Sequence, residues 1–387
     1  MAAPQRRADA SRVDVSGPTL RLILSRFAIT RLVLFGIASL AVGRLPVDPI
    51  EARGFHLPPQ PHPFLEAWAR YDACWFLTIA QHGYRDAIAG NEDMRAAFFP
   101  LFPSLIGGLT RIVGQPMIAG LVISNACYLG FLVLLWMLVE RDWGAHVAHG
   151  AVWTYLLFPS AFFLSGVYSE SVLLLTTTGA LLMARQERWL AAGVLAALAT
   201  LTRPLGVVAI VPVLAEYASR KRVASPDPAP SLACILVPAA AAAAAYVVLA
   251  WNVFGNPMAV VDMQASVRGE FSAPWEPFLE IWRHGPRLHA FNNSVIDATL
   301  ALAALVSLPV LFARVPLGYA CYALVVILVP VSQSLMSFNR LLLPSFPHAI
   351  LLARAMDRQW TASTLYAVFA IGQAVWMTAF ATWHWVA

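Results

Sequence analysis

Apolar segments recur from one end of the 387-residue chain to the other, separated by short gaps that hold most of the charged residues. A helix of roughly 20 apolar residues crosses the hydrocarbon core of a bilayer and satisfies its own backbone hydrogen bonds there. The pattern therefore predicts an all-α integral membrane protein with about eleven transmembrane helices. The expected spans are residues 27–43, 117–139, 151–165, 171–184, 190–201, 206–216, 232–254, 298–312, 317–332, 343–355 and 363–383.

The basic residues in the gaps indicate how these spans are oriented. If the N-terminus lies in the cytoplasm and the spans alternate, almost every short basic gap falls on the cytoplasmic side, as the positive-inside rule requires. Two long connections then lie outside the cytoplasm, at residues 44–97 and 255–297. The cytoplasmic basic groups are residues 6–31, Arg141, Arg185 with Arg188, residues 220–222, Arg314, and Arg354 with Arg358.

The same pattern divides the chain into segments. Residues 1–26 form a cytoplasmic tail, 27–356 a single transmembrane module, and 357–387 a C-terminal transmembrane helix. We expect the first span to be a signal anchor, although residues 41–43 also resemble a cleavage site. Residues 98–114 are apolar but short and interrupted by Pro100 and Pro103. This favours an interfacial or re-entrant helix, because counting it as a span would move the basic residues 220–222 outside.

Composition narrows the function further. Hydrophobic residues make up 59% of the chain and charged residues only 12%, against roughly 25% in a soluble domain. The net charge of +5 lies in the gaps rather than in a basic stripe with interleaved aromatic residues, which excludes nucleic-acid binding. The four cysteines form no CxxC pair, and no HxxxH or HExxH spacing occurs. Neither a disulfide framework nor a metal site made by the protein alone follows.

Unusual polar residues gather at the predicted outer face. Because charges at a membrane boundary are costly, they are candidates for function. Each also has an ordinary structural explanation: an ion pair of Asp72 with Arg70 or Arg95, a buried Glu170–Arg203 pair, a snorkelling arginine, or a loop histidine. The candidates are Asp72, Trp75 and His82 in "RYDACWFLTIAQHGY", Tyr168 and Glu170 in "FPSAFFLSGVYSES", Arg203 in "LTRPLG", Gln264 and Arg268 in "VVDMQASVRGEF", and Arg340 in "SFNRLLLPSFP".

Acids and arginines at one membrane face suit a substrate that is part lipid and part anion. Arginine grips a phosphate with two hydrogen bonds and keeps its charge. A nearby carboxylate can accept a proton from an attacking hydroxyl. Apolar spans offer a groove for a prenyl tail.

The segment "RYDACWFLTIAQHGY" resembles a motif of the PIG-V family, the GPI mannosyltransferase II group and its bacterial relatives. "AAFFPLFPSLI", "LLFPSAFFLSGVYSESVLLL" with "LATLTRPLG", and "SFNRLLLPSFP" match further blocks of that family in the same order, and "FGNPMAVVDMQASV" is similar to another. The resemblance covers residues 31–355. Two positions depart from the family pattern: Tyr71 replaces a tryptophan, and Phe76 replaces a tyrosine and so lacks its hydroxyl.

The resemblance implies a GT-C fold and a glycosyltransferase that uses a polyprenyl-phosphate-linked sugar. We expect it to transfer a hexose, with mannose favoured, to a hydroxyl of a lipid or glycan acceptor outside the bacterial cytoplasmic membrane, with inversion. The resemblance makes Asp72 the essential acid, and Glu170, Arg203 and Arg340 residues of the donor pocket. We assign Asp72 as general base, and Tyr168, Trp75, Gln264, Arg268 and His82 to substrate binding.

Other interpretations stay open. A GT-C enzyme of this kind can use a divalent cation such as Mg²⁺ or Mn²⁺, although no ligand cluster in the sequence requires one. The sugar could be glucose, galactose, arabinose or an aminosugar, because nothing in the sequence fixes the hydroxyl stereochemistry. A transporter or flippase of a lipid-linked or anionic substrate also has many spans and buried charges. A non-catalytic subunit that holds a lipid-linked sugar is a third alternative.

Overall fold

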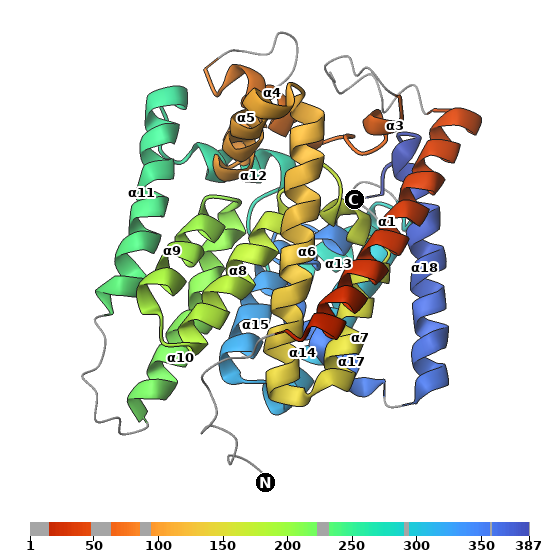
Figure 1. The fold of residues 1–387 in the computed structure, drawn as a ribbon. Helices are drawn as coiled ribbons and strands as arrows, with labels where there is room; N and C mark the ends of the chain where they lie inside the picture. The colour runs from red at the N-terminus through yellow and green to blue at the C-terminus, as the bar shows by residue number, and fades with distance from the viewer. Residues whose placement is uncertain are drawn as a thin grey trace.

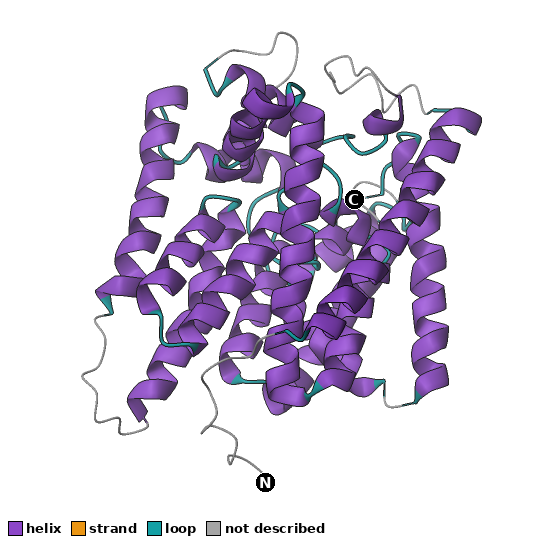
Figure 2. Cartoon of the chain, in the orientation of Figure 1, coloured by secondary structure: helices purple, strands orange, loops and turns teal. Residues whose placement is uncertain are grey.

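The computed structural model describes residues 15–47, 63–85, 94–222, 232–289, 294–356 and 358–386. Within these ranges the chain is helical, and pairing of extended backbone is limited to an isolated bridge between Arg287 and Ser294. Most of the long helices lie side by side and run between the same two ends of the molecule (Figures 1 and 2). The predicted all-α membrane fold is therefore confirmed.

In the part of the chain that the structure describes, five helices are long and apolar enough to cross a membrane. Three more apolar helices are shorter: α5 (Leu101–Val113), α9 (Trp189–Thr200) and α15 (Leu317–Val331). The number of eleven spans stays a prediction, because several of the expected segments form helices shorter than a bilayer crossing. The five long helices are α1 (Gly17–Arg44), α6 (Pro116–Trp143), α11 (Ala233–Phe254), α14 (Val295–Arg314) and α18 (Gln359–Ala381).

Prolines explain several of the short helices. α7 (Ala145–Leu157) ends just before Pro159, and the chain continues through a 3-10 turn, η2 (Ala161–Leu164), into α8 (Glu170–Arg185). After α9, Pro204 opens a second 3-10 segment, η3 (Pro204–Ala209), which leads into α10 (Ile210–Arg222). Proline disfavours helical backbone in the residue before it, so Arg203 is extended and the apolar run is divided into two pieces.

Basic residues from distant gaps meet at one end of the bundle. Arg185 at the end of α8 contacts Asp142 at 2.6 Å and Glu216 of α10 at 3.1 Å. The Arg354 guanidinium donates to the Arg314 carbonyl and lies 5.5 Å from the Trp143 ring centroid. We call this end, with Arg185, Arg314 and Arg354, the basic face. Basic connections that the sequence pattern assigned to one side of the membrane thus lie at one end of the structure.

The long connections lie toward the opposite end. The first contains α3 (Pro63–Glu66), α4 (Ala73–His82) and η1 (Met94–Ala97), and the second contains α12 (Ala259–Arg268) and α13 (Glu276–Arg283). Residues 98–114 give α5, which packs on α4 far from the basic face (Figure 1). A Cβ on Gly107 would lie 3.0 Å from the Ala80 carbonyl oxygen, so glycine permits this close helix contact.

The C-terminal third completes the bundle. α14 and α15 are followed by the short α16 (Phe338–Leu341), then α17 (Phe346–Ala355) and α18. α18 packs on α1 and α7, and its Gln373 donates to the Phe158 carbonyl at 3.0 Å. The sequence pattern treated the C-terminal helix as a segment separate from the transmembrane module. In the structure this helix, α18, packs against that module.

Candidate active site

Four of the predicted charged residues form one connected group of ion pairs, which we call the charged cluster: Asp72, Glu170, Arg203 and Arg340. The Nη2 of Arg340 lies 2.6 Å from Asp72 Oδ2, and its Nε lies 3.1 Å from Glu170 Oε1. Arg203 approaches the same Glu170 oxygen through Nη1 at 2.5 Å. Four segments far apart in the sequence thus place their charges against one another.

Helix starts position the two acids of the cluster. Asp72 immediately precedes α4, and Glu170 is the first residue of α8. Helix N-termini carry a partial positive charge that favours a carboxylate. The Asp72 side chain makes no capping hydrogen bond to α4, which leaves it directed to Arg340.

Strained backbone accompanies both ends of the Asp72–Arg340 pair. Tyr71, directly before Asp72, has φ of 52°, and Ser337, at the start of α16, has φ of 61°. Non-glycine residues in this left-handed region are uncommon and cluster at functional sites, where the surrounding packing holds them. The fold therefore supports this pair at some energetic cost.

The side chains of the charged cluster differ in how much of their surface is exposed. The Glu170 side chain is 1% exposed and Arg340 6%, whereas Asp72 is 28% exposed. Glu170 Oε1 faces two arginines, which offset the cost of burying a carboxylate. Its other oxygen, Oε2, is buried without a hydrogen-bond partner among the described residues. Asp72 is thus the carboxylate of the cluster that a substrate can reach.

Aromatic rings enclose Arg340. Its guanidinium carbon lies 5.2 Å from the Tyr168 ring centroid and 5.5 Å from that of Phe163. Burial disfavours the charged form of Arg340, yet Asp72 and Glu170 raise its pKa above the ordinary arginine value. Tyr168 is itself fixed by a 2.7 Å hydrogen bond from its hydroxyl to the Arg70 carbonyl. The predicted Tyr168 therefore lies beside the cluster as part of its wall.

Arg268 at the end of α12 adds a third arginine near the cluster. Its Nη1 donates to the Met336 carbonyl at 2.8 Å, four residues before Arg340. Burial, and then the charges of Arg340 and Arg203, lower the pKa of Arg268 to about 10. Gln264 lies one turn earlier on the same face of α12. The second long connection thus reaches the charged cluster.

Two predicted residues lie elsewhere on α4. Trp75 is 6% exposed and its ring stacks on Phe98 with centroids 6.0 Å apart, so it packs into the contact with the segment leading to α5. His82 is exposed at the opposite end of the helix, about 15 Å along its axis from Asp72. The structure does not bring His82 to the charged cluster.

The sequence did not predict the hydrogen bonds that hold Asn339, the residue before Arg340. Asp297, at the start of α14, accepts hydrogen bonds from the Asn339 backbone at 2.7 Å and from its side-chain amide at 2.9 Å. Ser160 donates to the Asn339 carbonyl at 2.8 Å. The sequence feature that could have indicated Asp297 is its position as a single acid at the start of an apolar segment. These bonds fix the residue that precedes Arg340.

The end of the chain holds the residues before Asp72. Arg70, which the ordinary structural explanation offered as a partner of Asp72, donates from Nη2 to the Ala381 carbonyl at 3.0 Å and lies 4.6 Å from the Trp383 ring centroid. The Tyr71 ring meets Trp383 and Trp385 edge-on at 5.4 and 5.1 Å. We call residues 382–386 the C-terminal clasp. It also accepts a 3.1 Å hydrogen bond from Asn339 at the Val386 carbonyl.

The described residues do not fit a bound metal. Among them, no three histidine, cysteine, aspartate or glutamate side chains come together. Asp72 and Glu170 each contact arginine, so an added cation would meet positive charge at both carboxylates.

Comparison with known proteins identifies the matching family. Residues 55–219 match the mannosyltransferase (PIG-V) family. The family resemblance seen in the sequence is thereby confirmed over these residues. The matched segment contains Asp72, Tyr168, Glu170 and Arg203, whereas Arg340 lies beyond it.

Three curated proteins match this chain over part of their length. GPI alpha-1,6-mannosyltransferase 2 of Mus musculus is 32% identical over 158 residues, which cover 37% of this chain and 30% of the mouse protein. The Cricetulus griseus protein of the same name gives the same values, and that of Rattus norvegicus is 31% identical. The match thus spans less than a third of these relatives.

Two solved structures are also similar. Both are of the Archaeoglobus fulgidus oligosaccharyltransferase. One, tethered to an acceptor peptide, gives a TM-score of 0.46 at 13% identity and covers 93% of this chain and 55% of that one. The other, in complex with Zn and sulfate, gives 0.43 at 12% identity, with 91% and 53% covered.

Proposed function

We propose that the protein transfers a hexose, mannose in the first instance, from a polyprenyl-phosphate-linked donor to an acceptor hydroxyl, with inversion at the anomeric carbon. Asp72 is the general base of this reaction. The family match over residues 55–219 supports a mannosyltransferase. The observation that carries the assignment of roles is the difference in exposure between the two carboxylates of the charged cluster.

Asp72 fits the role of base because one oxygen is held and the side chain is still accessible. Arg340 contacts Oδ2 and so fixes the plane of the carboxylate, while the side chain remains 28% exposed. An acceptor hydroxyl can reach such a group within hydrogen-bond distance. Glu170, almost fully buried between Arg203 and Arg340, suits positioning of those arginines rather than contact with an acceptor.

The arginines suit the leaving group. Three of them, Arg203, Arg268 and Arg340, lie near two carboxylates, so the site retains positive charge for an anion. A polyprenyl phosphate leaves as an anion and needs electrostatic stabilisation, which guanidinium groups supply through paired hydrogen bonds. The apolar surfaces of the neighbouring helices suit the prenyl chain.

The bond changes follow from these positions. Asp72 accepts the proton of the acceptor hydroxyl as its oxygen attacks the anomeric carbon from the side opposite the phosphate. The new carbon–oxygen bond forms while the bond to the phosphate oxygen breaks, and that oxygen keeps the electron pair. The arginines stabilise the charge that develops on the phosphate. Attack from the opposite side inverts the anomeric configuration.

The difference between the two ends of the bundle supports an extracytoplasmic location for the site. Positive gaps favour the cytoplasm, and the basic face gathers such gaps at the end away from α4 and α5. The charged cluster then belongs to the extracytoplasmic half of the protein. We propose a multi-pass protein of the bacterial cytoplasmic membrane, with lipids around it and a lipid or glycan acceptor arriving from outside.

An assay with purified protein and polyprenyl-phosphate-mannose tests the proposal. The acceptors are an extract of lipids and glycans, and the variants are Asp72→Asn and the matched control Glu276→Gln, an exposed acid on α13. We expect Asp72→Asn to lower the rate roughly 10²–10⁴-fold, the usual contribution of a positioned base, and Glu276→Gln to leave it unchanged.

Three results would change the proposal. Full activity of Asp72→Asn would exclude it as the base. Transfer only from a polyprenyl-phosphate-linked glucose, galactose, arabinose or aminosugar would replace mannose. No transfer from any of these donors, together with flipping of the lipid-linked sugar in proteoliposomes, would favour the transporter.

A further inference from the structure

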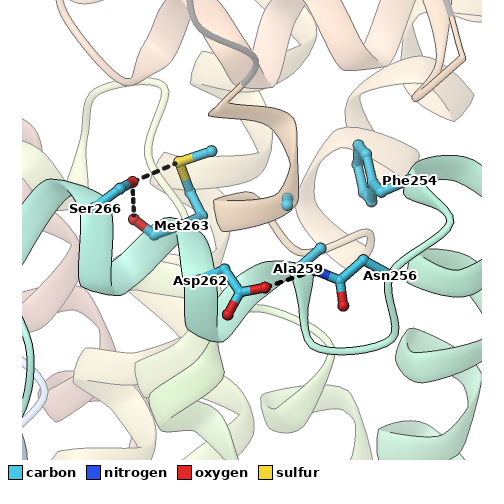
Figure 3. A pocket seen from close by; sticks show the side chains of 7 residues that line it. Phe254, Asn256, Ala259, Asp262, Met263 and Ser266 are labelled. Atoms are coloured by element: carbon cyan, nitrogen blue, oxygen red, sulfur yellow. Dashed lines mark hydrogen bonds between the residues drawn. The ribbon is translucent and has the colours of Figure 1, made fainter.

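An open pocket outside the charged cluster, which we call the cavity, lies between η1 and α12 (Figure 3). Its volume is about 380 Å³, large enough for a small organic group. None of the four residues of the charged cluster lines it, and the proposed reaction makes no use of it. It is lined by residues that include Ala96, Phe254, Asn256, Asp262, Met263 and Ser266.

One wall of the cavity is an ordered acid–amide pair. The Asn256 amide nitrogen donates to Asp262 Oδ2 at 2.6 Å, and the Asn256 amide oxygen accepts from the Met258 backbone N–H at 2.9 Å. The backbone donor fixes which end of the amide faces Asp262. Asp262 is exposed and has no ion-pair partner among the described residues. The pair therefore presents both acceptor and donor atoms to a ligand.

Much of the remaining lining is apolar. It includes Phe254, Ala259 and Met263, which Figure 3 shows together with the acid–amide pair, and Ala96. A sugar ring has hydroxyls that both donate and accept, together with a face of C–H groups that packs on an aromatic ring. The cavity offers a partner for each of these features.

Charge decides which part of a substrate fits. Among the described residues of the lining, the carboxylate of Asp262 is the one ionic group, and no arginine or lysine contributes to it. A phosphate would be repelled there, and a prenyl chain would leave the acid–amide pair without partners. The donor's phosphate instead finds its arginines at the charged cluster. A neutral, hydroxyl-rich group is the ligand that remains.

The position of the cavity relates it to the reaction. α12 contributes Asp262 to the cavity and, six residues later, Arg268 beside the charged cluster. These two residues are about 9 Å apart along the helix axis. We propose that the cavity binds a neutral saccharide or polyol unit of the acceptor, next to the unit whose hydroxyl reacts. This inference rests on the proposed transferase function and adds a specificity site for the acceptor.

A site-specific labelling experiment tests binding without catalysis. In Ser266→Cys the new thiol lies on the cavity wall, and its reaction with a maleimide is followed by mass spectrometry of the peptide that contains residue 266. The probes are methyl α-mannoside, mannobiose and myo-inositol. We expect at least one of them to slow labelling three-fold or more, and Asp262→Asn in the same background to remove the protection. Ser272→Cys, on the same connection outside the cavity, is the control and should label at one rate throughout.

Kinetics give the second measurement. Asp262→Asn should raise the acceptor KM about ten-fold, which corresponds to about 1.4 kcal/mol, while the donor KM and kcat stay unchanged. Glu270→Gln, an exposed acid just beyond α12, should change neither. Unchanged labelling with all three probes, or an increase in donor KM instead, would overturn the acceptor site.

The two proposals fail separately. Transfer from polyprenyl-phosphate-mannose without saccharide protection of residue 266 would retain the enzyme and remove the acceptor site. Protection that depends on Asp262, with no transfer from any donor, would retain a saccharide site and remove the transferase.

Discussion

Glu170 and Asp72 are both acids paired with arginine, but they differ in what surrounds them. Glu170 is 1% exposed and contacts two arginines, while Asp72 is 28% exposed and contacts one. Removing one partner of a buried ion pair leaves the other charge without compensation, at a cost of about 3–5 kcal/mol. Arg340 still has Glu170 as a partner when the Asp72 charge is removed, so this change leaves no uncompensated buried charge. The two residues should therefore separate stability from catalysis.

This difference gives a prediction for a pair of isosteric variants. We expect Glu170→Gln to lower the thermal unfolding midpoint of the purified protein by several degrees, because Arg203 and Arg340 lose their shared carboxylate. Asp72→Asn should lower activity with little change in that midpoint. Thermal unfolding of both proteins in the same detergent measures this, and equal midpoints would contradict the assigned roles.

Among the elements, the C-terminal clasp is the least expected contributor to the site. It holds Tyr71 between Trp383 and Trp385 and accepts a hydrogen bond from Asn339. Tyr71 precedes Asp72, and Asn339 precedes Arg340, so one segment holds the neighbours of both members of an ion pair. A clasp of this kind sets the distance between acid and arginine.

Replacing one of its tryptophans should therefore weaken catalysis without unfolding the bundle. An aromatic contact contributes about 0.5–1.5 kcal/mol, so we expect Trp385→Ala to lower kcat about two- to ten-fold. Trp360→Ala, at the other end of α18 and 74% exposed, is the matched control and should keep full activity. Steady-state kinetics with both variants measure this, and an unchanged kcat for Trp385→Ala would show that the clasp does not position Asp72.

What could be predicted from the sequence depends on how local the signal is. Apolar runs and prolines are local, so the helices and the break before Pro204 were predicted, and the costly charges Glu170, Arg203 and Arg340 stood out against apolar neighbours. The pairing of Asp72 with Arg340 joins residues 268 positions apart, and sequence reasoning offered the nearby Arg70 instead. The Asp297–Asn339 bond and the C-terminal clasp are tertiary in the same sense, and no local pattern marks them.

At the scale of the whole molecule, the orientation of the bundle in the membrane determines which sugar donor can reach the charged cluster. The basic face lies at the end of the bundle away from α4, the helix that Asp72 precedes. Nucleotide sugars are found in the cytoplasm, and three arginines could bind a diphosphate as well as a polyprenyl phosphate. The choice between these donors therefore depends on which end of the bundle faces the cytoplasm.

Cysteine labelling in intact bacteria decides between them. We expect Glu276→Cys, on α13 in the second long connection, to react with a membrane-impermeant maleimide in intact cells. Gln359→Cys, exposed at the start of α18 near the basic face, should react only after the membrane is opened. The positive-inside rule gives this direction, because the gaps around Arg185, Arg314 and Arg354 are basic. The reverse labelling pattern would place the charged cluster in the cytoplasm, and it would make a nucleotide sugar the donor to test in place of the polyprenyl-linked one.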